Sequence, residues 1–382
     1  MAEVILTGDQ KRAIAKATEW YKLGNRQVFT IAGYAGTGKT EIVKQMVESI
    51  GITGVHFCAY TGKASLVLNQ RGCPATTIHR LMYDFESSGV RVEGNRRLKD
   101  MKFRLKDTLE HGIQLVVVDE ISMVPEKMMK DLLSFGLPVI AIGDPGQLPP
   151  VKHKNNTYLD DPDVFLDTVH RQAECSSIIR VSMLVRQGKK LQVGSYGDDV
   201  VVIRKKDVTD KMLLGASQVI CGTHRTRRKL NNQVRELLGF DSEYPLVNDK
   251  IISGKNIWDL TLEGYPMING LMGYVTKIHG INHDKRLMEL DFRPDFMEEG
   301  MYFNRLIVDA HDFLGLEDEK NLNDNRNICW FDFGYALTCH KSQGSGFRNV
   351  LLYDEKRFCR DNEKRWLYTG ITRAENRLII AV

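Results

Sequence analysis

The segment from Gly33 to Thr40 has the residue types and spacing of a loop that binds phosphate groups. Glycine permits backbone angles closed to other residues, so successive N–H groups can converge on one phosphate. Lys39 is placed to reach the β- and γ-phosphates of a nucleotide, and the Thr40 hydroxyl is suited to ligating Mg²⁺. The residues predicted to surround the phosphates are Gly33, Gly36, Thr37, Gly38, Lys39 and Thr40. This pattern predicts a bound nucleotide and does not indicate what the nucleotide drives.

The residues on either side of the loop have the patterns of a strand and a helix. Val28 to Ile31 is short, apolar and rich in β-branched and aromatic side chains, which indicates a buried strand. Glu41 to Val47 carries apolar residues at helical spacing. A strand, a glycine loop and a helix in this order argue against a chance glycine-rich turn, and the helix N-terminus adds partial positive charge beside the phosphates.

Two adjacent acidic residues follow another apolar segment. Leu115 to Val118 is an unbroken apolar run, as expected of a central parallel strand, and it ends at Asp119 and Glu120. We expect Asp119 to hold Mg²⁺ and Glu120 to position and deprotonate the attacking water, although two acids after a strand also occur in plain loops. Val139 to Ile142 predicts the next strand, and Gln147 beyond it is expected near the γ-phosphate.

Composition is that of an ordinary soluble globular protein. The 382 residues are 42% hydrophobic and 27% charged, and a net charge of +4 permits a nucleic-acid partner without requiring one. Seven scattered cysteines without a C-x-x-C pair favour a reducing compartment and disfavour disulfides or a zinc site. The first residues lack a signal-peptide pattern, and no apolar run is long enough for a membrane span, so a cytoplasmic protein without a membrane partner is predicted.

Two segments depart from the alternation of strands and helices. Residues 83–106 combine turn signals with clustered basic residues and predict a small hairpin. The basic side chains fit either a solvated charged helix face or a contact with a polyanion. Residues 240–325 predict a small β-domain, because short strand patterns alternate there with Gly, Asn and Asp. Those strand patterns are Asp249–Ser253, Tyr274–Ile278, Leu287–Phe292 and Arg305–Val308.

Eight ordered motifs resemble those of the superfamily 1 helicases, most closely the RecD-like and Dda-like 5′-to-3′ branch. The motifs are GYAGTGKT, AYTGKA, TIHRLMY, VVVDEISM, GDPGQLPP, VHRQ, YALTCHKSQGSGF and YTGITRA. The run CHKSQG favours this branch over the 3′-to-5′ Rep-like branch. The resemblance implies an α/β fold with two RecA-like parallel-sheet domains, a small β-hairpin insertion and an SH3-like β-barrel insertion.

The resemblance also implies a division of the chain into domains. Residues 1–150 are expected to form the first RecA-like domain, with about 83–106 as a small pin. Residues 151–239 and 326–382 are expected to form the second RecA-like domain, and residues 240–325 the SH3-like insertion.

The same resemblance assigns further nucleotide-site residues. Arg171 and Arg373 match two arginines that reach from the second domain to the γ-phosphate, where a guanidinium stabilises the charge of phosphoryl transfer. Gln10 is expected to pair with the adenine edge, since an amide offers a donor and an acceptor, although a lone glutamine on a helix is usually just solvated. Gln343 and Gly344 are also expected at the nucleotide.

A second set of residues matches positions near a bound single strand. Their hydroxyl, imidazole and amine groups suit contacts to phosphate and sugar, which hold a strand without reading its sequence. The set is Thr61, Lys63, Thr77, His79, Thr338, His340 and Lys341. Spacing alone favours an ordinary half-buried histidine for His79. Tyr60 and Tyr83 are expected in the core, with stacking on a base as the alternative.

Together these features predict an ATP- and Mg²⁺-dependent helicase that moves 5′ to 3′ on single-stranded DNA and unwinds duplex. Its expected partners are single strands, duplex junctions and replication or recombination proteins, and a monomer in a prokaryotic or phage-infected cell is expected. The alternatives are an ATP-gated clamp that translocates or remodels without unwinding, and RNA as the substrate. A nucleotide kinase would account for the glycine loop but not for Arg171, Arg373 or the run around His340.

Overall fold

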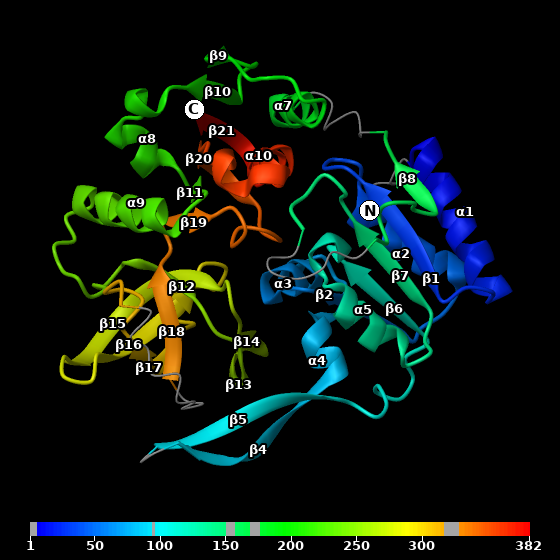
Figure 1. The fold of residues 1–382 in the computed structure, drawn as a ribbon, viewed down its shortest axis with the longest axis horizontal. Helices are drawn as coiled ribbons and strands as arrows, with labels where there is room; N and C mark the ends of the chain where they lie inside the picture. Colours follow the sequence, from blue (N-terminus) through cyan, green and yellow to red (C-terminus); the bar gives the residue numbers. More distant parts are fainter. Residues whose placement is uncertain (1–5, 94–95, 150–156, 169–175, 317–327) are drawn as a thin grey trace.

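Two six-stranded sheets, each built mainly from parallel strands, form the framework of the chain (Figure 1). The computed structural model describes residues 6–93, 96–149, 157–168, 176–316 and 328–382, and for residues 85–103 it describes the backbone alone. Arg171 lies outside the described residues. No helix in the described ranges combines the length and the apolar character needed to cross a bilayer.

The first sheet has the strand order β3-β2-β6-β7-β1-β8, and all of its strand pairs are parallel. Its strands are β1 (Val28–Gly33), β2 (Val55–Ala59), β3 (Ala75–Thr77), β6 (Leu115–Asp119), β7 (Val139–Gly143) and β8 (Val164–Leu166). The helical segments around it are α1 (Gly8–Leu23), α2 (Lys39–Ile50), α3 (Gly62–Gln70), α4 (Ile78–Met82), η1 (Ile121–Met123) and α5 (Glu126–Leu133). The predicted strands in this half are confirmed, and their carboxyl ends share the edge where α/β sheets bind ligands.

The second sheet has the order β19-β11-β20-β21-β10-β9, and only the short β9 pairs antiparallel in it. Its strands are β9 (Gly194–Ser195), β10 (Val200–Ile203), β11 (Gln218–Cys221), β19 (Ala336–Thr338), β20 (Phe347–Tyr353) and β21 (Ala374–Ala381). Its helical segments are α7 (Ser177–Arg186), η2 (Lys205–Asp207), α8 (Asp210–Gly215), α9 (His224–Leu237), η4 (Lys356–Asn362) and α10 (Glu363–Ile371).

A closed five-stranded barrel is inserted between α9 and β19 of the second sheet (Figure 1). Its strands are β12 (Lys250–Ser253), β15 (Met272–Asn282), β16 (Leu287–Pro294), β17 (Phe303–Asp309) and β18 (Ile328–Phe333), and a two-stranded excursion comprises β13 (Ile257–Leu262) and β14 (Tyr265–Met267). The four predicted strands of this insertion are confirmed.

The barrel also contacts the first half of the chain. Leu66 of α3 packs in the same hydrophobic cluster as Ile268 and the barrel core. A Cβ atom added at Gly62 would come within 2.6 Å of the Ile268 Cβ, so a larger residue at the start of α3 would push the barrel away. The contact therefore joins the first sheet to an insertion of the second.

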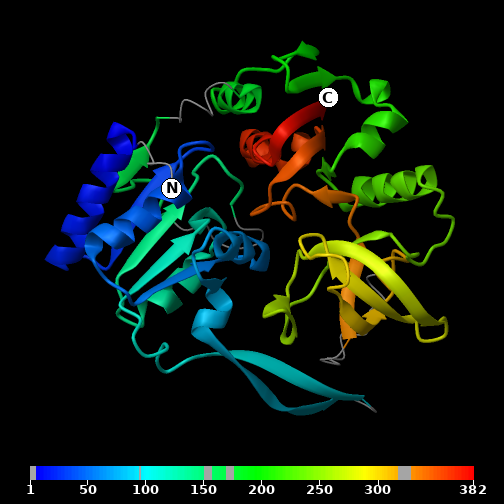
Figure 2. The ribbon, with the colours of Figure 1, turned by 180° about the vertical axis from the view of Figure 1, so that it is seen from behind.

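The segment after α4 forms one long antiparallel hairpin, β4 (Tyr83–Glu93) and β5 (Arg96–Leu105). Figures 1 and 2 show it projecting away from the first sheet as an extended ribbon. The predicted hairpin is thus present, and the alternative of a charged helix face is wrong, because residues 96–105 pair as a strand. A contact with a polyanion stays a prediction.

Two predicted domain boundaries are too early. β8 pairs with β1, so the first sheet extends past residue 150 to Leu166. β18 closes the barrel by pairing with β12 and β17, so the barrel continues past residue 325 to Phe333. A three-residue strand such as β8 carries too little pattern to be assigned from sequence, and β18 resembles any other strand that leads into a parallel sheet.

Candidate functional site

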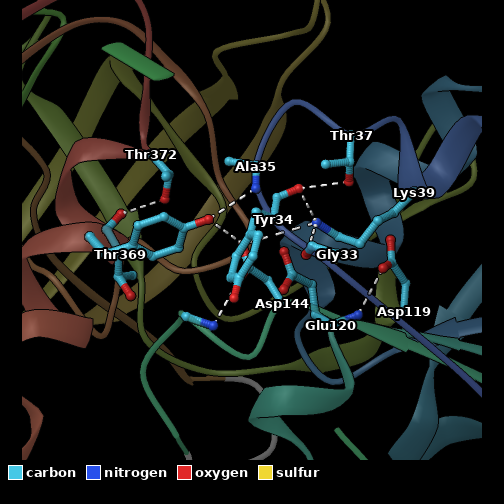
Figure 3. A network of polar contacts seen from close by, with 12 residues as sticks. Gly33, Tyr34, Ala35, Thr37, Lys39, Asp119, Glu120, Asp144, Thr369 and Thr372 are labelled. Atoms are coloured by element: carbon cyan, nitrogen blue, oxygen red, sulfur yellow. Dashed lines mark hydrogen bonds and ion pairs between the residues drawn. The ribbon is translucent and has the colours of Figure 1, made fainter. Parts of the chain in front are cut away.

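The loop from Gly33 to Thr40 has the geometry that an anion site needs (Figure 3). Gly36 and Gly38 have φ angles of 82° and 74°, which side chains rarely tolerate. Lys39 is the first residue of α2, so its amine and the helix N-terminus lie together. The Lys39 Nζ donates to the carbonyl oxygens of Gly33 and Tyr34 at 2.8 and 2.9 Å. The cation that would meet the phosphates is therefore held by the loop itself.

Gln10 supports this loop from α1. Its amide nitrogen donates to the Thr37 carbonyl at 3.0 Å, and its amide oxygen accepts from the Thr7 N–H in a capping box. The side chain is 1% exposed, which excludes the interpretation of a solvated glutamine. Both ends of the amide have partners here, so the adenine contact stays a prediction.

The two acidic residues at the carboxyl end of β6, Asp119 and Glu120, lie opposite the loop (Figure 3). The Asp119 carboxylate accepts from the Glu120 N–H at 2.8 Å, and the Thr40 side chain is near enough to lower the pKa of Asp119, which burial raises. The two groups predicted to hold Mg²⁺ thus lie near each other, and a hydroxyl beside a carboxylate is an oxygen donor set that this ion accepts. The residues present therefore fit a bound Mg²⁺.

Glu120 has a strained backbone and a perturbed carboxyl group. Its φ of 53° lies in the left-handed region, a conformation that costs free energy and that clusters at functional sites. Burial raises the pKa of Glu120, and the Asp119 carboxylate raises it further, while Arg373 and Lys39 oppose the shift. A carboxyl group with a raised pKa is a better proton acceptor at neutral pH.

Sequence reasoning missed two residues that meet at this site. Asp144, at the end of β7, is fully buried, and its Oδ2 lies 4.0 Å from the Lys39 Nζ. The Tyr368 hydroxyl of α10 donates to the same Oδ2 at 2.7 Å and accepts from the Ala35 N–H at 2.9 Å. Asp144 was detectable as an acid at a strand end, whereas Tyr368 meets the loop only through the tertiary fold.

Two more of the predicted catalytic residues, Gln147 and Arg373, lie at the same junction of the two sheets. Gln147 is 6% exposed, and its side-chain oxygen has no hydrogen-bond partner in the described part of the chain. The Arg373 guanidinium donates to Thr369 O at 3.1 Å and to Ser345 O at 3.1 Å, within its own half of the molecule. Its charge nevertheless opposes the raised pKa of Glu120. Contacts of Gln147 and Arg373 with the γ-phosphate stay predictions.

A second site, which we call the strand groove, lies between the first sheet, the second sheet and the barrel. It has a volume of about 340 Å³. Its lining includes six of the seven residues predicted to contact a strand: Thr61, Lys63, Thr77, His79, His340 and Lys341. Residues from opposite ends of the sequence thus face one space, as the prediction requires.

The remaining predictions for this region need adjustment. Thr338 is 7% exposed and is absent from the groove lining; its hydroxyl accepts from the Lys341 N–H. Gln343 lines the groove, and its amide donates to the Leu148 carbonyl at 3.0 Å. Gly344 lies close to the Thr61 hydroxyl, where a Cβ would approach to 3.0 Å. Gln343 and Gly344 therefore lie beside the groove, and their nucleotide contact stays a prediction.

The groove also has lining residues that the sequence did not indicate. Asn256, Asn269 and Gly270 come from the barrel insertion, and the sequence predicted no contact with a strand for any of them. A second pocket, of about 370 Å³, shares Gly62 and Thr77 with the groove and continues it between α3 and the β13–β14 excursion. Tyr60 and Tyr83 pack against the core of the first sheet, as expected, and Tyr60 also lines the groove.

Lys341 provides a pH-dependent prediction. Burial, and after it the nearby Arg227, lower the pKa of Lys341 to about 8. Burial also lowers the pKa of His79 and of His340, so both imidazoles are neutral above pH 7. If the Lys341 ammonium contacts phosphate, affinity for single strands should fall about tenfold between pH 7 and pH 9, as the lysine loses its proton.

The matched variant is Lys341→Arg, since a guanidinium stays protonated over this range. Fluorescence anisotropy of a labelled oligonucleotide at pH 7, 8 and 9 measures the affinity of both proteins. The arginine variant should show a much flatter pH profile. An equal loss of affinity in both proteins would remove Lys341 as the titrating contact.

The phosphate loop, the acid pair and the second sheet together define a class of protein. Two parallel sheets face each other across a P-loop nucleotide site, and one helix of the second sheet reaches into that site. The class is that of P-loop nucleotide hydrolases in which two sheets share one nucleotide, an arrangement that couples phosphoryl transfer to relative movement.

Comparison with known proteins identifies the family. A model described as AAA domain matches residues 5–206, which is more than half of the chain, and one described as UvrD-like helicase C-terminal domain matches residues 333–381. The chain belongs to the superfamily 1 helicases of the RecD, Dda and Pif1 type. The resemblance inferred from the motifs is confirmed.

Individual relatives agree with this assignment. The ATP-dependent RecD2 DNA helicase of Deinococcus radiodurans is 26% identical over 94% of this chain, which spans 47% of that protein. The ATP-dependent DNA helicase dda of Enterobacteria phage T4 is 26% identical, over 96% of this chain and 97% of its own length. The crystal structure of Bacteroides Pif1 with ADP-AlF3 and ssDNA matches 100% of this chain and 93% of its own, at 19% identity and a TM-score of 0.58. The chain thus spans about half of RecD2 and nearly all of dda.

Proposed function

We propose that this protein is an ATP-dependent DNA helicase that moves 5′ to 3′ on single-stranded DNA and unwinds duplex. The observation that carries the proposal is the shared construction of two sites. Residues of both sheets line the strand groove, and residues of both sheets meet at the phosphate loop. One relative movement of the sheets therefore changes both sites, which is what a nucleotide-driven motor requires.

The nucleotide chemistry is assigned to residues at the phosphate loop. The loop amides and Lys39 bind the ATP phosphates, and Thr40 and Asp119 hold Mg²⁺, which neutralises charge on the phosphates when bound. Glu120 accepts a proton from the attacking water, and Gln147 responds to the γ-phosphate. Arg373 stabilises the charge of the transition state after the cleft closes, and Arg171 is proposed for the same task. Support for the use of ATP comes from dda and RecD2, both described as ATP-dependent.

The strand is proposed to lie in the groove, where hydroxyls, imidazoles and one ammonium hold its backbone. Such contacts grip phosphate and sugar without selecting bases. The groove faces three structural units, so a strand there would bridge them. The Bacteroides Pif1 structure that this chain matches was solved with ssDNA, which supports a single strand as the occupant.

The finer domain assignments belong to the same proposal. We take the two parallel sheets as RecA-like motor domains and the five-stranded barrel as the SH3-like insertion of this branch. The β4–β5 hairpin is proposed as the pin that separates the strands of a duplex. Its length and its projection from the first sheet support that assignment (Figure 1). A monomer acting at duplex junctions, with replication or recombination proteins as partners, completes the proposal.

An ATP-gated clamp that moves along a strand without unwinding is the rival function, and RNA is the rival substrate. Steady-state ATP hydrolysis should rise at least tenfold with single-stranded DNA and much less with RNA of the same sequence. Hydrolysis that is equal with and without either nucleic acid would contradict the proposed motor. A larger stimulation by RNA would change the substrate and leave the motor in place.

A further inference from the structure

The Tyr368 hydroxyl lies between the two halves of the nucleotide site. Its oxygen accepts from the Ala35 N–H at 2.9 Å and donates its own proton to Asp144 Oδ2 at 2.7 Å. Tyr368 comes from α10 beside the second sheet, whereas Ala35 and Asp144 belong to the first. The side chain is 2% exposed, so these contacts are shielded from water.

The hydroxyl oxygen of Tyr368 accepts a hydrogen bond from a backbone N–H of the phosphate loop. Ala35 lies within the glycine loop, whose N–H groups converge on phosphates when a nucleotide is bound. In this arrangement the Ala35 N–H donates to the Tyr368 hydroxyl. The Lys39 amine donates to the carbonyls of Gly33 and Tyr34. Two of the groups that would bind ATP are therefore paired with the protein itself.

Asp144 fixes the orientation of the hydroxyl. The carboxylate is fully buried and also accepts from the Gly146 N–H at 2.8 Å. Burial, and after it the Asp144 charge, raises the pKa of Tyr368, so the hydroxyl keeps its proton at any working pH. Because that proton points to Asp144, a lone pair is left to face the Ala35 amide.

Helix α10 is also connected by hydrogen bonds to the strand groove. The Thr369 hydroxyl, next to Tyr368, accepts from the Leu148 N–H at 3.0 Å. The Leu148 carbonyl in turn accepts from Gln343, which lines the strand groove. Arg373 follows α10, and its guanidinium donates a hydrogen bond to the Thr369 carbonyl. A displacement of the groove wall is thus linked by hydrogen bonds to Tyr368 and to the proposed transition-state arginine.

We propose that Tyr368 is a positioning residue that restrains nucleotide binding until a strand is engaged. Without DNA its hydroxyl competes with ATP for the Ala35 N–H. Strand binding shifts the groove wall and α10, frees the amide for phosphate and moves Arg373 toward the cleft in one displacement. This inference rests on the proposed function, because it names the residue that couples the two sites of that motor.

The test is Tyr368→Phe, which removes the hydroxyl and keeps the ring that packs on Gly146. The control is Tyr196→Phe in the same half of the molecule, where the lost hydroxyl bonds to the backbone of Gln192. Affinity for a fluorescent, non-hydrolysable ATP analogue is measured without DNA. Tyr368→Phe should bind it about three- to tenfold tighter, the effect of one net hydrogen bond, and Tyr196→Phe should match wild type.

A second readout is hydrolysis with and without single-stranded DNA. Tyr368→Phe should hydrolyse ATP faster than wild type when DNA is absent, so that the stimulation by DNA shrinks. Damage to the fold would instead lower both rates, and affinity for single strands that equals or exceeds that of wild type checks that the variant is folded, because the coupling between the two sites is reciprocal. Analogue binding by Tyr368→Phe equal to or weaker than wild type overturns the inference.

The two proposals fail in different ways. Wild-type protein whose hydrolysis ignores DNA overturns the proposed motor. In that case tighter binding of the analogue by Tyr368→Phe still supports competition between the Tyr368 hydroxyl and ATP for the Ala35 N–H. Unchanged binding would overturn that competition too.

Discussion

Replacing Glu120 with glutamine is expected to leave ATP binding intact and to slow hydrolysis by about a hundredfold to ten-thousandfold, the range for loss of a general base. Glutamine has nearly the same shape but cannot accept the proton of the attacking water. The Glu120 carboxyl group lies beside Asp119, and burial raises its pKa. The Glu120 backbone has a φ of 53°, in the left-handed region. Single-turnover hydrolysis, together with equilibrium binding of ATP, separates the chemical step from affinity.

Two further variants serve as comparisons for Glu120→Gln. Glu126→Gln is the matched control, because Glu126 is an acid six residues along the chain whose ion pair with Lys130 lies on the surface of α5. It should hydrolyse ATP as wild type does. Lys39→Ala should instead lose nucleotide affinity or turnover, since it removes the cation of the loop. Wild-type turnover by Glu120→Gln would exclude Glu120 as the base.

Replacing Arg373 with lysine or alanine is expected to cost about a thousandfold in hydrolysis while single-strand binding is retained. A guanidinium delivered across the cleft stabilises charge spread over the γ-phosphate oxygens, and an ammonium cannot reproduce its planar donor array. Arg373 is 6% exposed in this arrangement and bonded to its own half of the molecule. It must therefore exchange these partners when the cleft closes. The same loss is expected for Arg171→Ala.

Arg377→Ala is the control for Arg373, because Arg377 is an exposed arginine on β21 four residues further on. Hydrolysis and oligonucleotide affinity are measured on each variant. A variant at position 373 that hydrolyses ATP normally would exclude a γ-phosphate contact. One that loses both hydrolysis and strand binding would indicate damage to the hydrogen bonds with Ser345 and Thr369.

What could be predicted from sequence was mostly local. The phosphate loop, the acids at the end of β6 and the apolar strands each carry their signal within about ten residues, and the structure forms them as expected. The barrel strands were indicated by strand patterns between turn residues. Its closure by β18 was missed, because pairing with β12 joins residues about 80 positions apart.

The parts of the site that were missed depend on distant contacts. The tyrosine hydroxyl at position 368 meets Ala35 across 333 positions, and no local pattern marks that meeting. Gln10 was assigned to adenine by motif, while its observed partner, the Thr37 carbonyl, lies 27 positions away. Asn256 and Asn269 reach the groove from the barrel insertion, for whose residues no contact with a strand was predicted. Motif spacing indicates which groups belong to a site, and only the fold shows how they pair.

Directional unwinding is the most direct test of the proposed motor. Two partial duplexes of identical sequence, one with a 5′ single-stranded tail and one with a 3′ tail, are incubated with excess protein, ATP and Mg²⁺, and strand release is followed by fluorescence. We predict release from the 5′-tailed duplex alone. Release from the 3′-tailed duplex alone would contradict the polarity, and release from neither, with DNA-stimulated hydrolysis intact, would contradict unwinding and leave a translocating clamp.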